Sequence, residues 1–357
     1  MRITSATIVA LVGGCSYFEV PYGDKATDFV IGRTMELGNI AGVMEYTADV
    51  EPRTTSHHGM VALNMRSPLL PGIALTVEGM NEVGLTISGQ TLRQSEYQKK
   101  EAGKLDIDAL SVTREVLRRC DSVDDAVKFL GNVSVTPPPA IGSPDGNGIH
   151  WALHDPTGRS IVIEYLKGEM VVYNNTPRVM TNDPDLHWHW RNLDTYVNLN
   201  PSFPHQNDFL AVDTEVGSVP SAVGHGWNLF GLPGDSSPPS RFVRMFYLRG
   251  YALKHTKVNT TSDAMALSTV MLNNLMFPTG SVAKDPKVLT DPYETVPYAV
   301  IKVPSEKLVV FRGYRNTQWR QIDLKKVNFN VAKQWPVEDG SLGIRELIQE
   351  DESTPVV

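Results

Sequence analysis

Several features that define other protein classes are scarce in this chain of 357 residues. It has only two cysteines, Cys15 and Cys120, which are too few for a disulfide framework. No apolar run approaches the roughly 18 residues of a membrane span. The net charge of -7 argues against a nucleic-acid-binding protein, which should carry a basic surface. What remains is an ordinary composition, 41% hydrophobic and 20% charged, typical of a soluble globular protein with a sizeable core.

Two common catalytic patterns are also missing. His154 and Asp155 could belong to a serine triad, but the chain has no Gly-x-Ser-x-Gly nucleophile elbow. Residues His187–Trp190 read HWHW, so both histidines would share one face if the segment were a strand. No cysteine, aspartate or glutamate at metal-ligand spacing completes that pair. We therefore expect neither a metal nor another cofactor.

The most informative feature that is present is Cys15, which follows the apolar segment Ala6–Val12 and two glycines. As the first residue of a mature chain, it would combine a thiol nucleophile with an α-amine of ordinary pKa about 8. Four interpretations stay open: a secretory signal, a self-cleaved propeptide, a lipoprotein signal, and a first strand with a buried cysteine. The signal interpretation favours a secreted or periplasmic protein, and lipidation would block the amine.

The middle of the chain predicts antiparallel strands. Residues Ile149–His154 and Ser160–Tyr165 alternate in polarity around the turn Asp155–Gly158, which indicates a hairpin. Residues Met170–Tyr173 follow as a third strand, and Gly79–Ser88 reads as a turn leading into another.

Helical spacing of apolar residues occurs in two regions, Ala109–Cys120 and Ser262–Leu275. The first places Cys120 on the apolar side, so we expect it in the core. Ser122, with Asp125 three residues later, predicts a capped second helix over Ala126–Leu130.

Five segments occur in an order that resembles the choloylglycine hydrolase family, which includes penicillin V acylases and bile salt hydrolases. They are Cys15, Gly32–Glu36 (GRTME), Met80–Leu85 (MNEVGL), Met180–Pro184 (MTNDP), and Gly231–Asp235 (GLPGD) followed by Ser240–Phe242. The resemblance implies an α+β fold of the N-terminal nucleophile hydrolase type, a four-layer αββα sandwich. It also implies a leader over 1–14 that is removed and one amidase domain over 15–335. The composition from Pro336 onward, with six acidic residues, predicts a partly disordered acidic tail over 336–357.

The resemblance assigns roles to individual residues. Cys15 matches the nucleophile, and Arg33 matches an arginine whose charge favours the thiolate. Glu36 stands where relatives often have aspartate, and we expect it to orient the α-amine. Asn182 matches an asparagine that donates to the oxyanion, and Arg241 matches an arginine that reaches the nucleophile.

Thr91 occupies the second oxyanion position, where bile salt hydrolases carry asparagine and penicillin V acylases carry tyrosine. It matches neither class, although its backbone N–H could still serve. The expected reaction is hydrolysis of a linear amide through a thioester. Penicillin V, conjugated bile acids and N-acyl homoserine lactones all fit as small-molecule substrates with a hydrophobic acyl group.

Two alternatives remain beside this acylase. One is a lipid-amide hydrolase of the acid ceramidase type, and the other is a non-catalytic lipoprotein anchored through Cys15. The loop-rich segment Pro201–Phe230 falls where some relatives carry an arm that docks onto a neighbouring subunit. A homotetramer is therefore an expectation from the resemblance.

Overall fold

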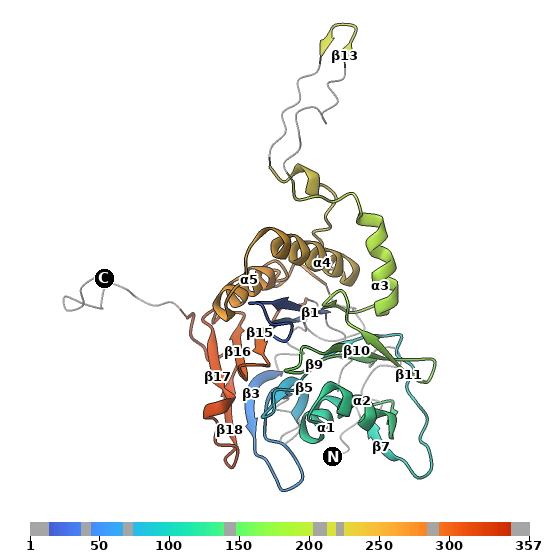
Figure 1. Cartoon of the computed structure of the whole chain (residues 1–357), viewed down its shortest axis with the longest axis vertical. Coiled ribbons are helices and arrows are strands. Elements are labelled where there is room, and N and C mark those ends of the chain that lie inside the picture. Colours follow the sequence, from blue (N-terminus) through green and yellow to red (C-terminus); the bar gives the residue numbers. More distant parts are fainter. Residues whose placement is uncertain are drawn as a thin grey trace, which may run out of the picture.

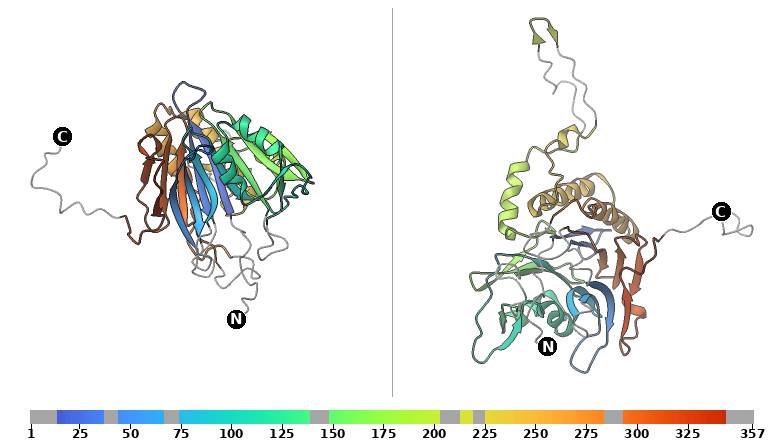
Figure 2. Two further views of the ribbon diagram at one scale, coloured as in Figure 1. Left: turned by 90° about the horizontal axis from the view of Figure 1, so that it is seen from below. Right: turned by 180° about the vertical axis from the view of Figure 1, so that it is seen from behind.

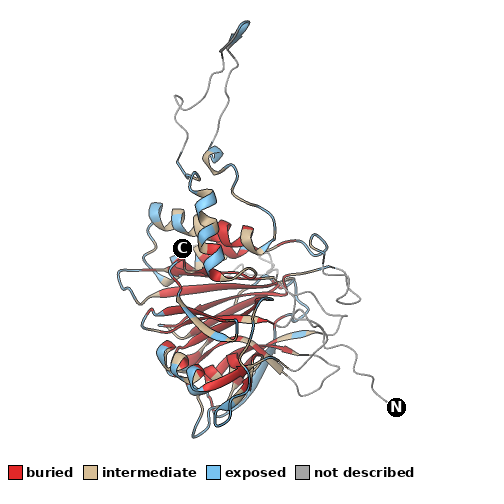
Figure 3. Ribbon diagram, turned by 90° about the vertical axis from the view of Figure 1, so that its right-hand side faces the viewer, coloured by how far each residue is buried: buried red, intermediate tan, exposed pale blue. Residues whose placement is uncertain are grey.

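The computed structural model describes residues 14–36, 44–66, 74–138, 148–202, 213–218, 225–283 and 293–343. Two antiparallel sheets lie face to face, and helices cover the outer side of each sheet (Figure 1). Seen from the side, the buried residues concentrate in the stacked strands and in the helix faces against them (Figure 3). The expected αββα sandwich is confirmed.

The first sheet contains six strands, and its N-terminal strand is second from one edge. In spatial order they are β12 (Val179–Met180), β1 (Gly14–Pro21), β2 (Phe29–Glu36), β15 (Tyr298–Val303), β16 (Leu308–Gly313) and β17 (Arg320–Asp323). All of β2 is buried, because helix α5 covers one of its faces and the second sheet covers the other.

The second sheet contains eight strands. In spatial order they are β11 (Glu169–Asn174), β10 (Ser160–Leu166), β9 (Ile149–His154), β6 (Thr86–Thr91), β5 (Ala74–Asn81), β4 (Met60–Arg66), β3 (Glu45–Glu51) and β18 (Lys333–Pro336). The predicted hairpin and third strand are β9, β10 and β11, and the strand predicted near Ser88 is β6.

Two short strand pairs lie outside the large sheets. They are β7 (Leu105–Asp108) with β8 (Val133–Thr136), which are parallel, and β13 (Asp213–Thr214) with β14 (Gly217–Ser218). Short 3-10 turns complete the described elements: η2 (Leu193–Tyr196), η4 (Trp227–Leu229) and η5 (Leu324–Lys326).

The helices form the two outer layers, with α1 and α2 on one side and α4 and α5 on the other (Figure 2). Their bounds are α1 (Val112–Arg119), α2 (Val123–Gly131), α3 (Leu186–Asn192), α4 (Pro238–His255) and α5 (Thr261–Asn273). The Ser122 side chain accepts from Asp125 N at the start of α2, as the sequence predicts. Cys120 is buried beside α1 and α2, in the expected core position.

Two sequence interpretations need correction. The sequence analysis identified no helix over 238–255, yet α4 is the longest described helix, and prolines at its first positions begin it. The HWHW segment is helical in α3 rather than extended. Successive helical residues turn by about 100°, so His187 and His189 point in different directions and share no strand face.

The described start of the acidic tail packs on the body: Val337 is buried and its N–H donates to Tyr46 O over 2.8 Å. The rest of the expected tail, 344–357, and the expected leader up to residue 13 lie outside the described residues. Within the described ranges, no helix combines the length and apolar character needed to cross a membrane.

Candidate active site

The register of β1 and β2 decides what surrounds Cys15. Cys15 pairs with Met35, and Gly14 pairs with Glu36. Because side chains alternate along a strand, Cys15, Arg33 and Met35 face the second sheet, and Glu36 faces the α4 side. The thiol is therefore held between the two sheets, where Cys15 is only 3% exposed.

Arg33 is fully buried and lies directly beside the thiol. Its Nη2 contacts Cys15 Sγ at 3.3 Å and donates to Gly89 O at 3.0 Å. Its Nη1 donates to Glu78 and, over 2.6 Å, to Tyr298 Oη. Burial opposes its charge, but Glu78, Tyr298 and Cys15 together hold the pKa of Arg33 above its ordinary value. Arg33 is thus a fixed cation next to Sγ.

Glu78 and Lys302 complete a buried charge cluster with Arg33. Lys302 Nζ donates to Glu78 Oε2 and to Ser88 Oγ, each at 2.6 Å, and all three ionisable residues are fully buried. Burial lowers the pKa of Lys302, and the Glu78 carboxylate opposes that shift; with Lys302 protonated, two cations and one carboxylate leave one positive charge in excess. A thiolate at Cys15 would neutralise this cluster, which favours its formation.

Burial raises the pKa of the Cys15 thiol above its ordinary value, and the Arg33 charge acts in the opposite direction. Arg33 therefore lowers the pKa of Cys15, as expected, but burial raises it by more.

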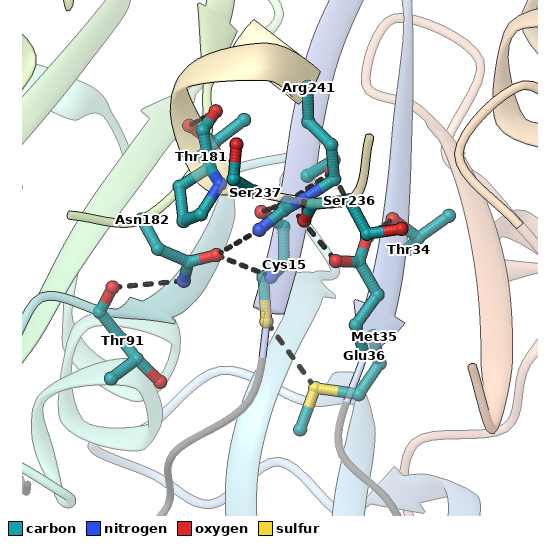
Figure 4. A network of polar contacts seen from close by, with 12 residues as sticks. Cys15, Thr34, Met35, Glu36, Thr91, Thr181, Asn182, Ser236, Ser237 and Arg241 are labelled. Carbon is teal, nitrogen blue, oxygen red and sulfur yellow. Dashed lines mark hydrogen bonds and ion pairs between the residues drawn. The ribbon is translucent and has the colours of Figure 1, made fainter. Parts of the chain in front are cut away.

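A second polar chain lies on the side of the Cys15 backbone nitrogen (Figure 4). Cys15 N–H donates to Asn182 Oδ1 over 2.7 Å, and Arg241 Nη2 donates to the same oxygen over 2.8 Å. Arg241 Nη1 also donates to Cys15 O and Ser16 Oγ, at 2.6 and 2.7 Å. The structure thus brings Asn182 and Arg241 to the nucleophile from distant parts of the chain.

Two neighbours fix this chain in place. His189 Nε2 lies 2.9 Å from Asn182 O, and its ring stacks on Phe242. Burial lowers the pKa of His189 to about 4, so the ring is neutral and donates to that carbonyl. Asp235 accepts from Ser237 N and Ser240 Oγ at the start of α4, and Arg241 forms an ion pair with Glu36.

The expectation that Glu36 orients the α-amine stays a prediction, because Cys15 N is a peptide nitrogen here and donates to Asn182 Oδ1. The Glu36 carboxylate accepts from Ser16 Oγ and Thr34 Oγ1, and pairs with Arg241 Nη1 at 3.1 Å. Gly14 packs against Glu36 so closely that a Cβ there would lie 2.3 Å from Glu36 Oε2.

Thr91 lies at the end of β6 near this chain. Asn182 Nδ2 donates to Thr91 O over 2.9 Å. Leu92 N bonds Gly148 O, and Thr91 pairs with Ile149 in register, so the Thr91 N–H points away from β9. That is the side on which Gly89 O and Thr91 O receive Arg33 and Asn182.

Sequence reasoning missed Glu78, Lys302 and Tyr298. A signal for the two charges was present, because Glu78 and Lys302 each stand within a predominantly apolar stretch, LTVEGM and YAVIKV. Charged residues in such stretches are rarely buried unless they are paired. Among the described residues, no group of three or more histidine, cysteine or acidic side chains is arranged to hold a metal ion.

The chain is similar to several known hydrolases. The chain is 30% identical to the bile salt hydrolase/transferase of Clostridium perfringens over 257 residues, which are 71% of this chain and 74% of that protein. It is 28% identical to the penicillin V acylase of Pectobacterium atrosepticum over 72% of this chain and 64% of that protein.

A solved variant of the conjugated bile acid hydrolase from Clostridium perfringens superposes with a TM-score of 0.77 at 25% identity. The match covers 93% of this chain and 100% of that one. The family model of linear amide C–N hydrolases, choloylglycine hydrolase family, matches residues 21–336, and this chain belongs to that family.

Proposed function

We propose that this hydrolase cleaves amides of hydrophobic acyl groups with Cys15 as an N-terminal nucleophile, once residues 1–14 have been removed. The observation that carries the proposal is the double engagement of Cys15. Arg33 lies 3.3 Å from its Sγ, and Asn182 lies 2.7 Å from its N. Thiol and nitrogen each have a dedicated polar partner, as a residue that uses both groups requires.

In the proposed reaction, the thiol proton passes to the α-amine and the thiolate attacks the carbonyl carbon of the amide. The C–N bond then breaks, and the leaving amine takes the proton from the α-ammonium group. A thioester remains on Cys15. The α-amine next removes a proton from water, whose oxygen attacks the thioester and releases the carboxylic acid and the free thiol.

The oxyanion would lie between Thr91 and Asn182. The Thr91 N–H points to the nucleophile side of β6, and the Asn182 amide nitrogen carries a second proton besides the one given to Thr91 O. Two such donors can stabilise a tetrahedral intermediate by a few kcal/mol. In this arrangement the Thr91 side chain is not needed, which removes the difficulty that it matches neither family class.

The lipoprotein alternative is disfavoured by the burial of Cys15. A diacylglyceryl group on Sγ would have to emerge from between the two sheets, where the residue is 3% exposed. The choice among penicillin V, conjugated bile acids, N-acyl homoserine lactones and ceramide-like lipids is made by assaying purified protein on one amide of each class.

Maturation supplies the first prediction. Intact-mass analysis of active protein should show Cys15 as the first residue with a free amine, and Cys15→Ala should abolish hydrolysis. Iodoacetamide should label mature Cys15 faster than Cys120. Burial raises the pKa of both thiols, but Arg33 opposes that effect at Cys15, whereas Asp125 and Asp121 add to it at Cys120 and its pKa rises to about 12. Full activity in protein that retains Met1 would contradict the mechanism, because the nitrogen of Cys15 would be part of a peptide bond.

A further inference from the structure

Strands β5 and β6 separate beside Cys15. They pair at Glu78 with Ser88, at Gly79 with Ile87 and at Met80 with Thr86, and within these two described strands no pairing continues towards Thr91. Gly89 O consequently meets no β5 partner and accepts from Arg33. Val77 O of β5 still lies against Gly89, 3.3 Å from the position of a Cβ there, so the gap between the two strands opens beyond this contact, towards Leu75 and Thr91.

A pocket occupies this gap. It is lined by Cys15 and Arg33 at one end, by Leu75 and Gln90 from the two separated strands, and by Leu110 at the start of α1. The pocket itself is narrow, with a cavity volume of about 40 Å³, and it is partly open to solvent. It passes from the thiol between β5 and β6 towards the helices on the outer side of the second sheet.

The position of the pocket indicates which part of a substrate enters it. The leaving amine has to receive its proton from the α-amino group of Cys15, so it must lie on the side of Asn182. The pocket lies on the opposite side of Cys15, where Sγ faces Arg33 and Met35. The acyl chain is therefore the part that enters.

Gln90 is the unusual residue of this pocket. It is 2% exposed, and neither its Nε2 nor its Oε1 has a hydrogen-bond partner among the described residues. It shares a face of β6 with Ser88, which contacts Lys302 of the first sheet, so the amide points into the space beside the nucleophile. A buried amide without partners is unfavourable, and a bound ligand that supplies them removes that penalty.

We propose that Gln90 selects acyl groups that carry a hydroxyl close to the amide carbonyl; this inference rests on the proposed function. A primary amide presents its N–H and its C=O side by side. One hydroxyl can accept from Nε2 and donate to Oε1, which satisfies both unpartnered atoms. The apolar remainder of the pocket, including Leu75 and Leu110, receives the hydrocarbon part of the chain.

The test compares matched substrates on processed enzyme. N-decanoyl homoserine lactone is compared with its α-hydroxy and β-hydroxy forms, so that the leaving amine stays constant. The wild type should prefer one hydroxylated substrate in kcat/KM by about tenfold or more, since a hydrogen bond to a buried group has this magnitude. Gln90→Leu keeps the size of the side chain, and it should reduce that ratio to near unity.

Gln321→Leu is the matched control, because Gln321 is exposed on β17, away from the pocket. It should keep the wild-type ratio. The melting temperature gives a readout independent of activity: Gln90→Leu should match or exceed the wild type, because it removes an unsatisfied buried amide.

Three outcomes would overturn the inference: a wild type with no preference, a Gln90→Leu enzyme that retains it, or a clear loss of melting temperature in Gln90→Leu. The proposed function fails separately. If the mature wild type hydrolyses neither these lactones nor phenoxyacetyl, bile-acid or ceramide amides, the acylase assignment is wrong. If it hydrolyses any of them, the acylase assignment stands, and the decanoyl, α-hydroxydecanoyl and β-hydroxydecanoyl amides of the leaving amine that it accepts give the ratio that decides on Gln90.

Discussion

At the scale of single residues, the chemistry of Cys15 depends on charges that lie one contact away. Arg33 contacts the thiol. Glu78 holds Arg33 in position, and Lys302 shares the Glu78 carboxylate with it. Glu78 would neutralise Arg33 alone, and Lys302 supplies the cation that offsets the carboxylate. Lys302 is therefore a positioning residue whose charge reaches the thiol through Glu78 and Arg33.

Replacing Lys302 by Met should raise the pKa of mature Cys15. Removing a cation disfavours the thiolate, so the pH profile of iodoacetamide labelling should move to higher pH. At neutral pH, labelling should become about tenfold slower for every pH unit by which the profile moves, and it should approach the wild-type rate in alkaline buffer.

Lys302→Arg keeps the charge and should lie closer to the wild type in this series. Lys326→Met is the control, because the Lys326 side chain is 83% exposed. An unchanged labelling profile in folded Lys302→Met protein would show that Lys302 has no influence on the thiol.

Glu36 provides a second prediction at this scale. Its carboxylate compensates Arg241, which in turn holds Asn182 and the carbonyl of Cys15. Glu36→Gln keeps the size and removes the charge, and we expect kcat/KM to fall by about 100-fold or more. Glu36→Asp keeps the charge with a shorter reach and should be much milder.

Both Glu36 variants must first be shown by mass to lack residues 1–14, so that failed maturation is not mistaken for failed catalysis. If the Gln variant equals the wild type while the Asp variant is inactive, then size rather than charge governs this position, and the assigned role is wrong.

At the scale of elements, strand β1 contains the Gly14–Cys15 bond, which is the bond that the proposed maturation breaks. Its register places Gly14 opposite Glu36 and against Arg241, where a Cβ would lie 2.3 Å from a Glu36 oxygen and 2.9 Å from Arg241 Nη2. The site is thus tightly packed around the bond that maturation is proposed to break. A side chain at residue 14 would disturb the same groups that act on Cys15.

Gly14→Ala should therefore lower the yield of processed protein, measured by intact mass over time. The processed fraction should have the wild-type kcat, because residue 14 is no longer present in it. Gly250→Ala is the matched control: a Cβ at Gly250 would meet nothing within 4 Å, and alanine is favoured over glycine within helix α4 by about 0.5–1 kcal/mol. Normal processing of Gly14→Ala would contradict the close packing.

At the scale of the whole molecule, large apolar side chains are exposed around η4, away from the two sheets. Trp227 is 54% exposed and Phe230 is 89% exposed, and the small β13–β14 hairpin belongs to the same region of the chain (Figure 1). Exposed apolar groups of this kind mark interaction sites. We propose that this region docks onto a second copy of the chain in a homotetramer.

Phe230→Asp should reduce the molar mass measured by light scattering after size exclusion, because a carboxylate cannot be buried in an apolar interface without a partner. Leu342→Asp makes the same change at a residue that is 64% exposed elsewhere, and it should leave the mass unchanged. A wild type that is monomeric at assay concentration would remove the proposal altogether.

The predictions that proved correct came from local sequence patterns with one physical cause. Alternation in the β9–β10–β11 segment and the Ser122 cap predicted their elements correctly. Helix α4 was missed because its residues are polar and apolar in nearly equal measure, and its buried face includes Arg241 and Arg244. The α3 segment alternates by coincidence, and its helical state follows from the Asp185 cap and packing against Phe242.

The sequence by itself determined the nucleophile candidate, the family motifs and the alternation that builds the two sheets, because each is a property of neighbouring residues. Only the tertiary structure decided what surrounds Cys15. Glu78 and Lys302 reach Arg33 across the space between two sheets, and Asn182 rather than Glu36 meets the Cys15 nitrogen. The pocket with Gln90 exists because β5 and β6 separate, and strand pairing over such distances is set by the packing of the whole fold.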